Sequence, residues 1–90
     1  MKKAIVTVIG HDRVGIIAAV SAKLAEYGVN VLDINQTILQ EYFTMIMLVD
    51  ISCAKLSFGE VKNGLDALGG EMGLSIRIQN EEIFTAMNNI

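Results

Sequence analysis

The sequence contains no proline, no tryptophan and a single cysteine. With Cys53 alone, the chain cannot form an internal disulfide, which suits a reducing compartment. Purely apolar runs such as Met45 to Val49 fall far short of the roughly 20 residues that cross a bilayer. The beginning of the chain, around Lys2 and Lys3, lacks the apolar segment of a signal peptide. We therefore expect a cytoplasmic protein that makes no membrane contact.

Positive charge is also scarce. The chain has 7 basic and 10 acidic residues, for a formal net charge of −3 at pH 7. Beyond Lys2 and Lys3 the basic residues do not cluster, so the basic surface that binds phosphates of nucleic acids is missing. We expect no nucleic acid partner.

Groups for catalysis or metal binding are few and scattered. His11 is the single histidine and the one candidate for a base near neutral pH, and the serines are dispersed along the chain. A catalytic site needs a nucleophile, a base and an orienting group together. The carboxylates of Asp12, Asp33 and Glu41 lack the spacing of metal ligands. We expect neither catalytic residues nor a metal or cofactor, and predict that the protein is not an enzyme.

Apolar residues, in contrast, are abundant. They make up 52% of the 90 residues, and the mean hydropathy is +0.48. A chain of this length forms one small domain, which buries only about 60–65% of the surface of its unfolded state. Because one small core cannot easily hide so many apolar side chains, we expect an oligomer, most simply a homodimer.

The first half of the chain predicts a strand, a helix and a strand. Residues 4–9 are rich in β-branched side chains, which favours a buried strand. Apolar residues then recur at helical spacing, which predicts a helix from about residue 13 to 27. Asp12 could cap its first turn, and Gly28 stands where a left-handed residue ends a helix. Alternation of apolar and polar residues over 29–40 predicts a second strand.

The second half repeats this pattern after a turn expected at Glu41-Tyr42. A third strand, residues 43–51, is apolar on both faces, with Ile46 and Leu48 on the second face. Ser57 and Glu60 form a capping-box pattern, which predicts a helix ending at Gly69-Gly70. Residues 74–79 alternate as a fourth strand, and residues 81–90 have the apolar spacing of a short helix.

The order strand-helix-strand-strand-helix-strand predicts an α+β protein with the ferredoxin-like βαββαβ sandwich. Its four-stranded antiparallel sheet would carry two helices on one face, with the terminal helix added. We assign residues 1–80 to this domain and residues 81–90 to the helix. The second sheet face, with Ile46 and Leu48, would be covered by the terminal helix, by a partner subunit or by both.

The loop between the first strand and the first helix is the leading candidate for a binding site. It has the sequence Gly10-His11-Asp12-Arg13-Val14-Gly15 and ends at the predicted helix start. Unpaired backbone N–H groups at a helix start can receive a carboxylate or another anion. No Gly-Lys-Ser or Gly-Lys-Thr follows, so phosphate or nucleotide binding is only weakly supported.

Two segments, Asp12-Arg13-Val14-Gly15-Ile16 and Tyr27-Gly28-Val29-Asn30-Val31, resemble the ACT domain family. The resemblance extends over residues 3–80, although Val14 replaces a proline that is common in the family. It implies a βαββαβ module that binds amino acids or other small ligands, usually as a side-by-side dimer. The whole chain is similar to small stand-alone ACT proteins that carry a short C-terminal helix.

The resemblance also implies an effector site in the loop and at the start of the second strand, completed by the partner subunit in many relatives. Asp12 could accept hydrogen bonds from a ligand ammonium, whether or not it also caps the helix. The N–H groups of residues 14–16 could receive a carboxylate, and Asn30, unless it is simply a turn residue, could donate and accept. The candidate ligand-binding residues are Gly10, His11, Asp12, Arg13, Val14, Gly15, Ile16 and Asn30.

We therefore expect a regulatory domain that binds a small-molecule effector, most simply an amino acid, as a homodimer. It could act on a regulated protein partner if the effector binds two states with different affinity. The alternative is a structural or protein-interaction module without a functional ligand site.

Overall fold

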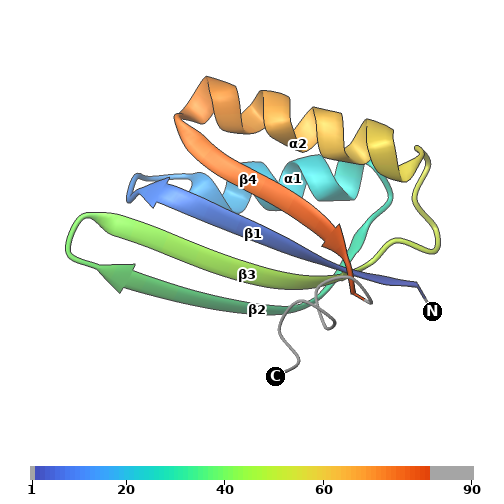
Figure 1. The fold of residues 1–90 in the computed structure, drawn as a ribbon, viewed down its shortest axis with the longest axis horizontal. Coiled ribbons are helices and arrows are strands. Elements are labelled where there is room, and N and C mark those ends of the chain that lie inside the picture. Colours follow the sequence, from blue (N-terminus) through green and yellow to red (C-terminus); the bar gives the residue numbers. More distant parts are fainter. Residues whose placement is uncertain (1, 82–90) are drawn as a thin grey trace.

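The computed structural model describes residues 2–81. Apart from Glu81, the predicted terminal helix over residues 81–90 lies outside the described residues. The elements follow the predicted order (Figure 1). They are β1 (Lys3–His11), α1 (Ile16–Glu26), β2 (Asn30–Leu39), β3 (Tyr42–Asp50), α2 (Phe58–Met72) and β4 (Leu74–Asn80).

The strands form one four-stranded antiparallel sheet in the order β2-β3-β1-β4. In the centre, β1 pairs with β3 from Lys3 opposite Asp50 to His11 opposite Tyr42. The edge strand β2 carries an irregularity between Val31 and Asp33, after which its register on β3 is regular again. The predicted ferredoxin-like βαββαβ fold is confirmed.

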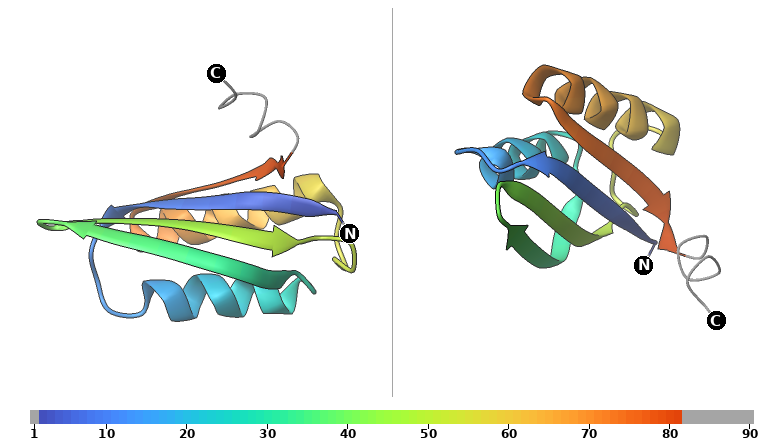
Figure 2. Two further views of the ribbon diagram at one scale, coloured as in Figure 1. Left: turned by 90° about the horizontal axis from the view of Figure 1, so that it is seen from below. Right: turned by 60° about the vertical axis from the view of Figure 1, so that its left-hand side comes forward.

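Both helices pack on the same face of the sheet, where they enclose the hydrophobic core (Figures 1 and 2). Every second residue of β1 and β3 points into this core, as strand geometry requires. The helices contribute residues at helical spacing. The fully enclosed side chains of these elements include Val6, Val8, Met45, Met47, Val49, Ile16, Val20, Leu24, Val61 and Leu65.

The other face of the sheet carries no helix among residues 2–81, as the sequence predicts. Ile46 remains 42% exposed and Ile9 49% exposed on this face, and Leu48 and Ile5 are half-buried. The prediction that β3 carries apolar residues on both faces is therefore confirmed. One face serves the core and the other is open.

The prediction that Asp12 caps α1 is wrong. The helix begins at Ile16, and its N-cap residue is Gly15, which makes no side-chain cap. Asp12 still belongs to the end of the sheet, because its N–H donates to the Glu41 carbonyl at 2.7 Å. Gly15 turns the chain into the helix with a φ of 92°, a left-handed value that glycine adopts without penalty. The predicted left-handed residue at the other end, Gly28, is confirmed by its φ of 75°.

The turn after β2 lies one residue earlier than predicted. Gln40 and Glu41 form it, with Gln40 at a φ of 56°, and Tyr42 already belongs to β3. The third strand correspondingly ends at Asp50, so Ile51 lies just beyond it.

The capping box of α2 is confirmed, since Ser57 and Glu60 exchange side-chain and backbone hydrogen bonds. The predicted end at Gly69-Gly70 is wrong, because α2 continues to Met72 and ends at Gly73 with a φ of 70°. Gly69 instead packs directly against the start of β4. A Cβ atom there would lie 2.6 Å from the Leu74 carbonyl oxygen.

The neighbouring glycines of α2 provide a matched test of this packing. We expect Gly69→Ala to lower the free energy of unfolding by about 1–3 kcal/mol, because the methyl group must displace backbone. Gly70→Ala meets nothing within 4 Å and should raise stability by about 0.5–1 kcal/mol through helix propensity. Urea unfolding of both variants measures the difference. Equal effects of the same sign would contradict the close approach at Gly69.

Candidate functional site

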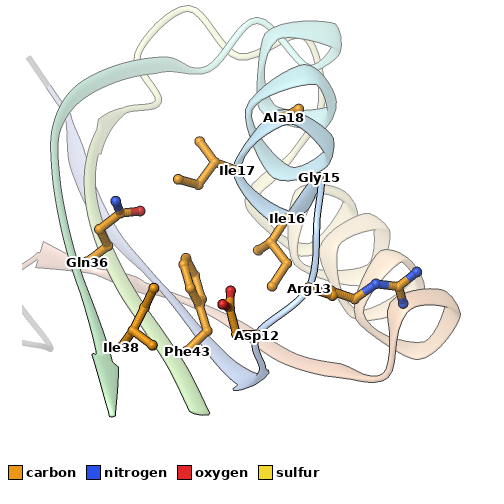
Figure 3. Close-up of a pocket in the computed structure, with 9 residues that line it drawn as sticks. All are labelled: Asp12, Arg13, Gly15, Ile16, Ile17, Ala18, Gln36, Ile38 and Phe43. Atoms are coloured by element: carbon orange, nitrogen blue, oxygen red, sulfur yellow. The ribbon is translucent and has the colours of Figure 1, made fainter. Parts of the chain in front are cut away.

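A cavity of about 340 Å³ opens between the start of α1, the second half of β2 and the start of β3. Its walls come from three parts of the sequence that the fold brings together (Figure 3). The lining residues are Asp12, Arg13, Gly15, Ile16, Ile17, Ala18, Gln36, Ile38 and Phe43. The loop that the sequence singled out therefore borders a hollow of the size of a small ligand.

Asp12 supplies the negative charge of this cavity. Its side chain extends into the space between Ile16 and Phe43 (Figure 3). Its backbone is fixed by the bond to Glu41, whereas its exposed carboxylate forms no hydrogen bond or ion pair within residues 2–81. The carboxylate is thus available to accept hydrogen bonds from a cationic group.

The start of α1 supplies the opposite polarity. The first-turn N–H groups of an α-helix have no partner inside the helix, and the helix dipole adds partial positive charge there. No side chain caps this end, because Gly15 has none and Asp12 lies too early in the chain. The first helical bond joins the Ala19 N–H to the Gly15 carbonyl at 2.9 Å. The N–H groups of the residues before Ala19 lie at the end of α1 that borders the cavity.

Between these polar groups the cavity is apolar. Ile16 and Phe43 are buried, with 2% and 3% exposure, and form its inner wall. Ile17 and Ile38 are 38% and 55% exposed and lie nearer its mouth. Such a surface can accommodate an aliphatic or aromatic group of a ligand.

The sequence did not predict the cavity residues of β2 and β3, which are Gln36, Ile38 and Phe43. Gln36 lies on the helix-facing side of β2, where it pairs with the core residue Met45. Its amide can both donate and accept hydrogen bonds at the cavity. The sequence did contain one signal, since Gln36 is a polar residue on the core-facing side of a predicted strand. It did not show which loop Gln36 would lie against.

Arg13 lines the cavity with its stem, but its guanidinium points away from it (Figure 3). Its Nη1 atom donates to the Met72 carbonyl at 3.0 Å, at the last residue of α2. A cation suits this position, because helix C-termini carry partial negative charge. Arg13 therefore ties the loop to the second helix.

The remaining loop candidates lie beside the cavity and do not line it. The rings of His11 and Tyr42 lie 5.2 Å apart between centroids, at the exposed end of β1 and β3. Val14 is 99% exposed. Gly10 lies against Leu74, where any side chain at Gly10 would clash with the leucine.

Asn30 lies at the opposite end of β2, where it pairs with Asp50. Strand geometry places it roughly 20 Å from Gln36, so one chain cannot bring Asn30 to this cavity. Its role as a ligand contact stays a prediction and requires a second copy of the chain.

Hydrogen bonds shift the pKa of Asp50 and that of Lys23, two residues that do not line the cavity. The hydroxyl and N–H of Ser52 donate to Asp50 and lower the pKa of that carboxyl. A hydrogen bond from Lys23 to Glu26 raises the pKa of that amine. Within residues 2–81 no group of three or more potential metal ligands is clustered, and no helix is long and apolar enough to span a bilayer.

A family model described as "ACT domain" matches residues 2–79. The chain belongs to the ACT domain family. The resemblance noted in the sequence is thereby confirmed. ACT domains are commonly ligand-binding regulatory domains.

Two relatives of this ACT domain match it over nearly their whole length. A UPF0237 protein of Clostridium acetobutylicum is 61% identical over 88 residues, which cover 98% of this chain and 99% of that protein. The structure of an ACT domain protein from Streptococcus pneumoniae has a TM-score of 0.81 at 47% identity, covering 92% and 93% of the two chains. The regulatory subunit of aspartate kinase from Thermus thermophilus has a TM-score of 0.66 at 28% identity. In that pair, 87% of this chain aligns with 50% of the other.

The start of the ACT domain's first helix yields a second prediction. Asp12→Ala removes no cap, so we expect its free energy of unfolding to stay within about 0.5 kcal/mol of the parent. Gly15→Ala forces a side chain into the left-handed region and should cost about 1–2 kcal/mol. Thermal and urea unfolding of the ligand-free variants compare the two. A larger loss for Asp12→Ala than for Gly15→Ala would mean that Asp12 caps the helix after all.

Proposed function

We propose that this protein is a regulatory domain that binds a free amino acid in the cavity at the start of α1. One observation carries the proposal. The same hollow presents an unpaired carboxylate, an uncapped helix start and an apolar wall. These are the three kinds of group that a zwitterion with a side chain requires.

Each part of an amino acid has a counterpart in the cavity. The ammonium would donate to Asp12, and charge-assisted hydrogen bonds of this kind are stronger than neutral ones. The carboxylate would accept from the N–H groups at the start of α1. The amide of Gln36 could hydrogen-bond either group, and the side chain would lie on Ile38 and Phe43. The volume of about 340 Å³ falls at the small end of the range for ligand pockets.

The proposal includes a homodimer and a cytoplasmic location. One side of the cavity is lined by β2, an edge strand whose Ile34, Ile38 and Leu39 are 40%, 55% and 70% exposed. A second copy at this edge would cover apolar surface, close the cavity and bring in groups such as Asn30. An amino acid that binds the dimer more tightly than the monomer would then control association, and through it a partner protein.

The open face of the sheet favours a second candidate function, an interaction module without a functional ligand site. Ile9 and Ile46 are exposed there, and exposed apolar patches often mark protein contacts. The two candidates differ in whether a small molecule changes the stability of the protein.

A thermal-shift screen with each of the standard amino acids tests the first candidate. An amino acid present at about a hundred times its Kd adds about 2.7 kcal/mol to the free energy of unfolding, which raises Tm by several degrees. The amino acid that gives the largest shift is then titrated by calorimetry.

Asp12→Asn should weaken that amino acid's affinity about ten- to a hundredfold, because it removes the charge that faces the ammonium. The matched control is Asp66→Asn, which makes the same charge change on the exposed side of α2, away from the cavity and from the β2 edge. It should bind like the parent. If no amino acid shifts Tm, or if Asp12→Asn binds as tightly as Asp66→Asn, the amino-acid proposal fails and the interaction module remains.

A further inference from the structure

The charged side chains around the cavity at the start of α1 limit which side chain a ligand can carry. Of the described residues that line the cavity, only Asp12 and Arg13 are charged. The guanidinium of Arg13 points away from the cavity, and its Nη1 atom donates to the Met72 carbonyl at 3.0 Å (Figure 3). The lining residues therefore direct no side-chain cation toward a carboxylate on the side chain of a ligand.

The two polar features that would bind the ammonium and the α-carboxylate of an amino acid lie together. The Asp12 carboxylate and the start of α1 border the same part of the cavity, next to Ile16 (Figure 3). A lysine or arginine ligand would use both of them for its ammonium and α-carboxylate. The second positive charge of that ligand would then have no lining carboxylate to pair with, and burying an unpaired charge is costly.

The rest of the cavity is mainly apolar surface from two elements. Ile17 extends into the cavity from α1, and Ile38 and Phe43 face it from the sheet (Figure 3). Ile38 lies directly opposite Phe43 in the pairing of β2 and β3. Gln36 is exposed, so its amide can keep hydrogen bonds to water while a ligand's side chain lies against the isoleucines.

We infer that the cavity selects amino acids with an apolar side chain, and that Ile17 is a residue that determines this preference. The inference rests on the proposed function and narrows its ligand class. An apolar group gains free energy when it leaves water for the surface of Ile17 and Ile38. A carboxylate or an amide of the same shape loses hydration there without gaining a partner.

Three amino acids of matched shape test the preference. The side chains of leucine, asparagine and aspartate have nearly the same shape but differ in polarity and charge. Calorimetric titration of the full-length protein gives the Kd of each. We expect leucine to bind at least about tenfold more tightly than asparagine, and aspartate to bind most weakly.

The outcomes separate this inference from the proposed function. If leucine binds no more tightly than asparagine or aspartate, while some amino acid binds and loses affinity in Asp12→Asn, the apolar preference is wrong and the proposed function stands. If no amino acid binds, both are wrong.

Substitution of Ile17 tests its role in the preference. Ile17 is 38% exposed, so a lysine there can reach solvent and still border the cavity. Ile17→Lys should lower the preference for leucine over aspartate about ten- to a hundredfold, because the ammonium can pair with the ligand's carboxylate. The milder Ile17→Thr should lower the preference for leucine over asparagine. Far-UV circular dichroism checks that both variants are folded.

The matched control is Ala67→Lys, which adds the same charge at an exposed position of α2, away from the cavity. It should keep the preferences of the parent. If Ile17→Lys and Ile17→Thr bind the three amino acids with the same ratios as Ala67→Lys, Ile17 does not determine the preference and the inference is overturned.

Discussion

The packing of two helices on one face of a four-stranded sheet is the constraint on which the rest of the structure depends. It concentrates the core on the alternate residues of β1 and β3, and it leaves the opposite face without a helix from residues 2–81. Because the edge strand β2 is largely exposed, α1 covers its end near Ile38 incompletely. The open face thus follows from the packing of both helices on one side of the sheet, and the cavity lies where α1 leaves the end of β2 exposed on that side.

The connection from β1 to α1 places polar groups at the cavity that we propose as a binding site. Asp12 is held to the sheet by its bond to Glu41, and Gly15 directs the chain into the helix without a capping side chain. Arg13 fastens the same loop to the end of α2. The backbone of Asp12 and the uncapped helix start therefore border one hollow from fixed positions. If a ligand binds there as proposed, little free energy is lost in ordering this backbone.

Most of the fold could be predicted from the sequence, because apolar residues that alternate along a strand or recur at helical spacing are the residues that become buried. The errors concern residues with two possible roles. Asp12 and the pair Gly69-Gly70 are residue types that often occur at helix ends, but contacts distant in sequence determine their roles. Asp12 bonds to Glu41 through its backbone, and Gly69 packs against the backbone of Leu74. Of the predicted site residues, Asp12, Arg13, Gly15 and Ile16 line the cavity. The contribution of β2 and β3 to the cavity depends on strand order and could not be predicted.

The most direct test of the account is a map of where an amino acid binds. Backbone amide shifts of the isotopically labelled protein would be recorded by NMR with and without a mixture of the standard amino acids. The account predicts that the largest changes fall on Gly15, Ile16 and Ile17, with smaller ones near Gln36. Changes confined to the open face around Ile46, or the absence of any change, would contradict the assignment of the site to the start of α1.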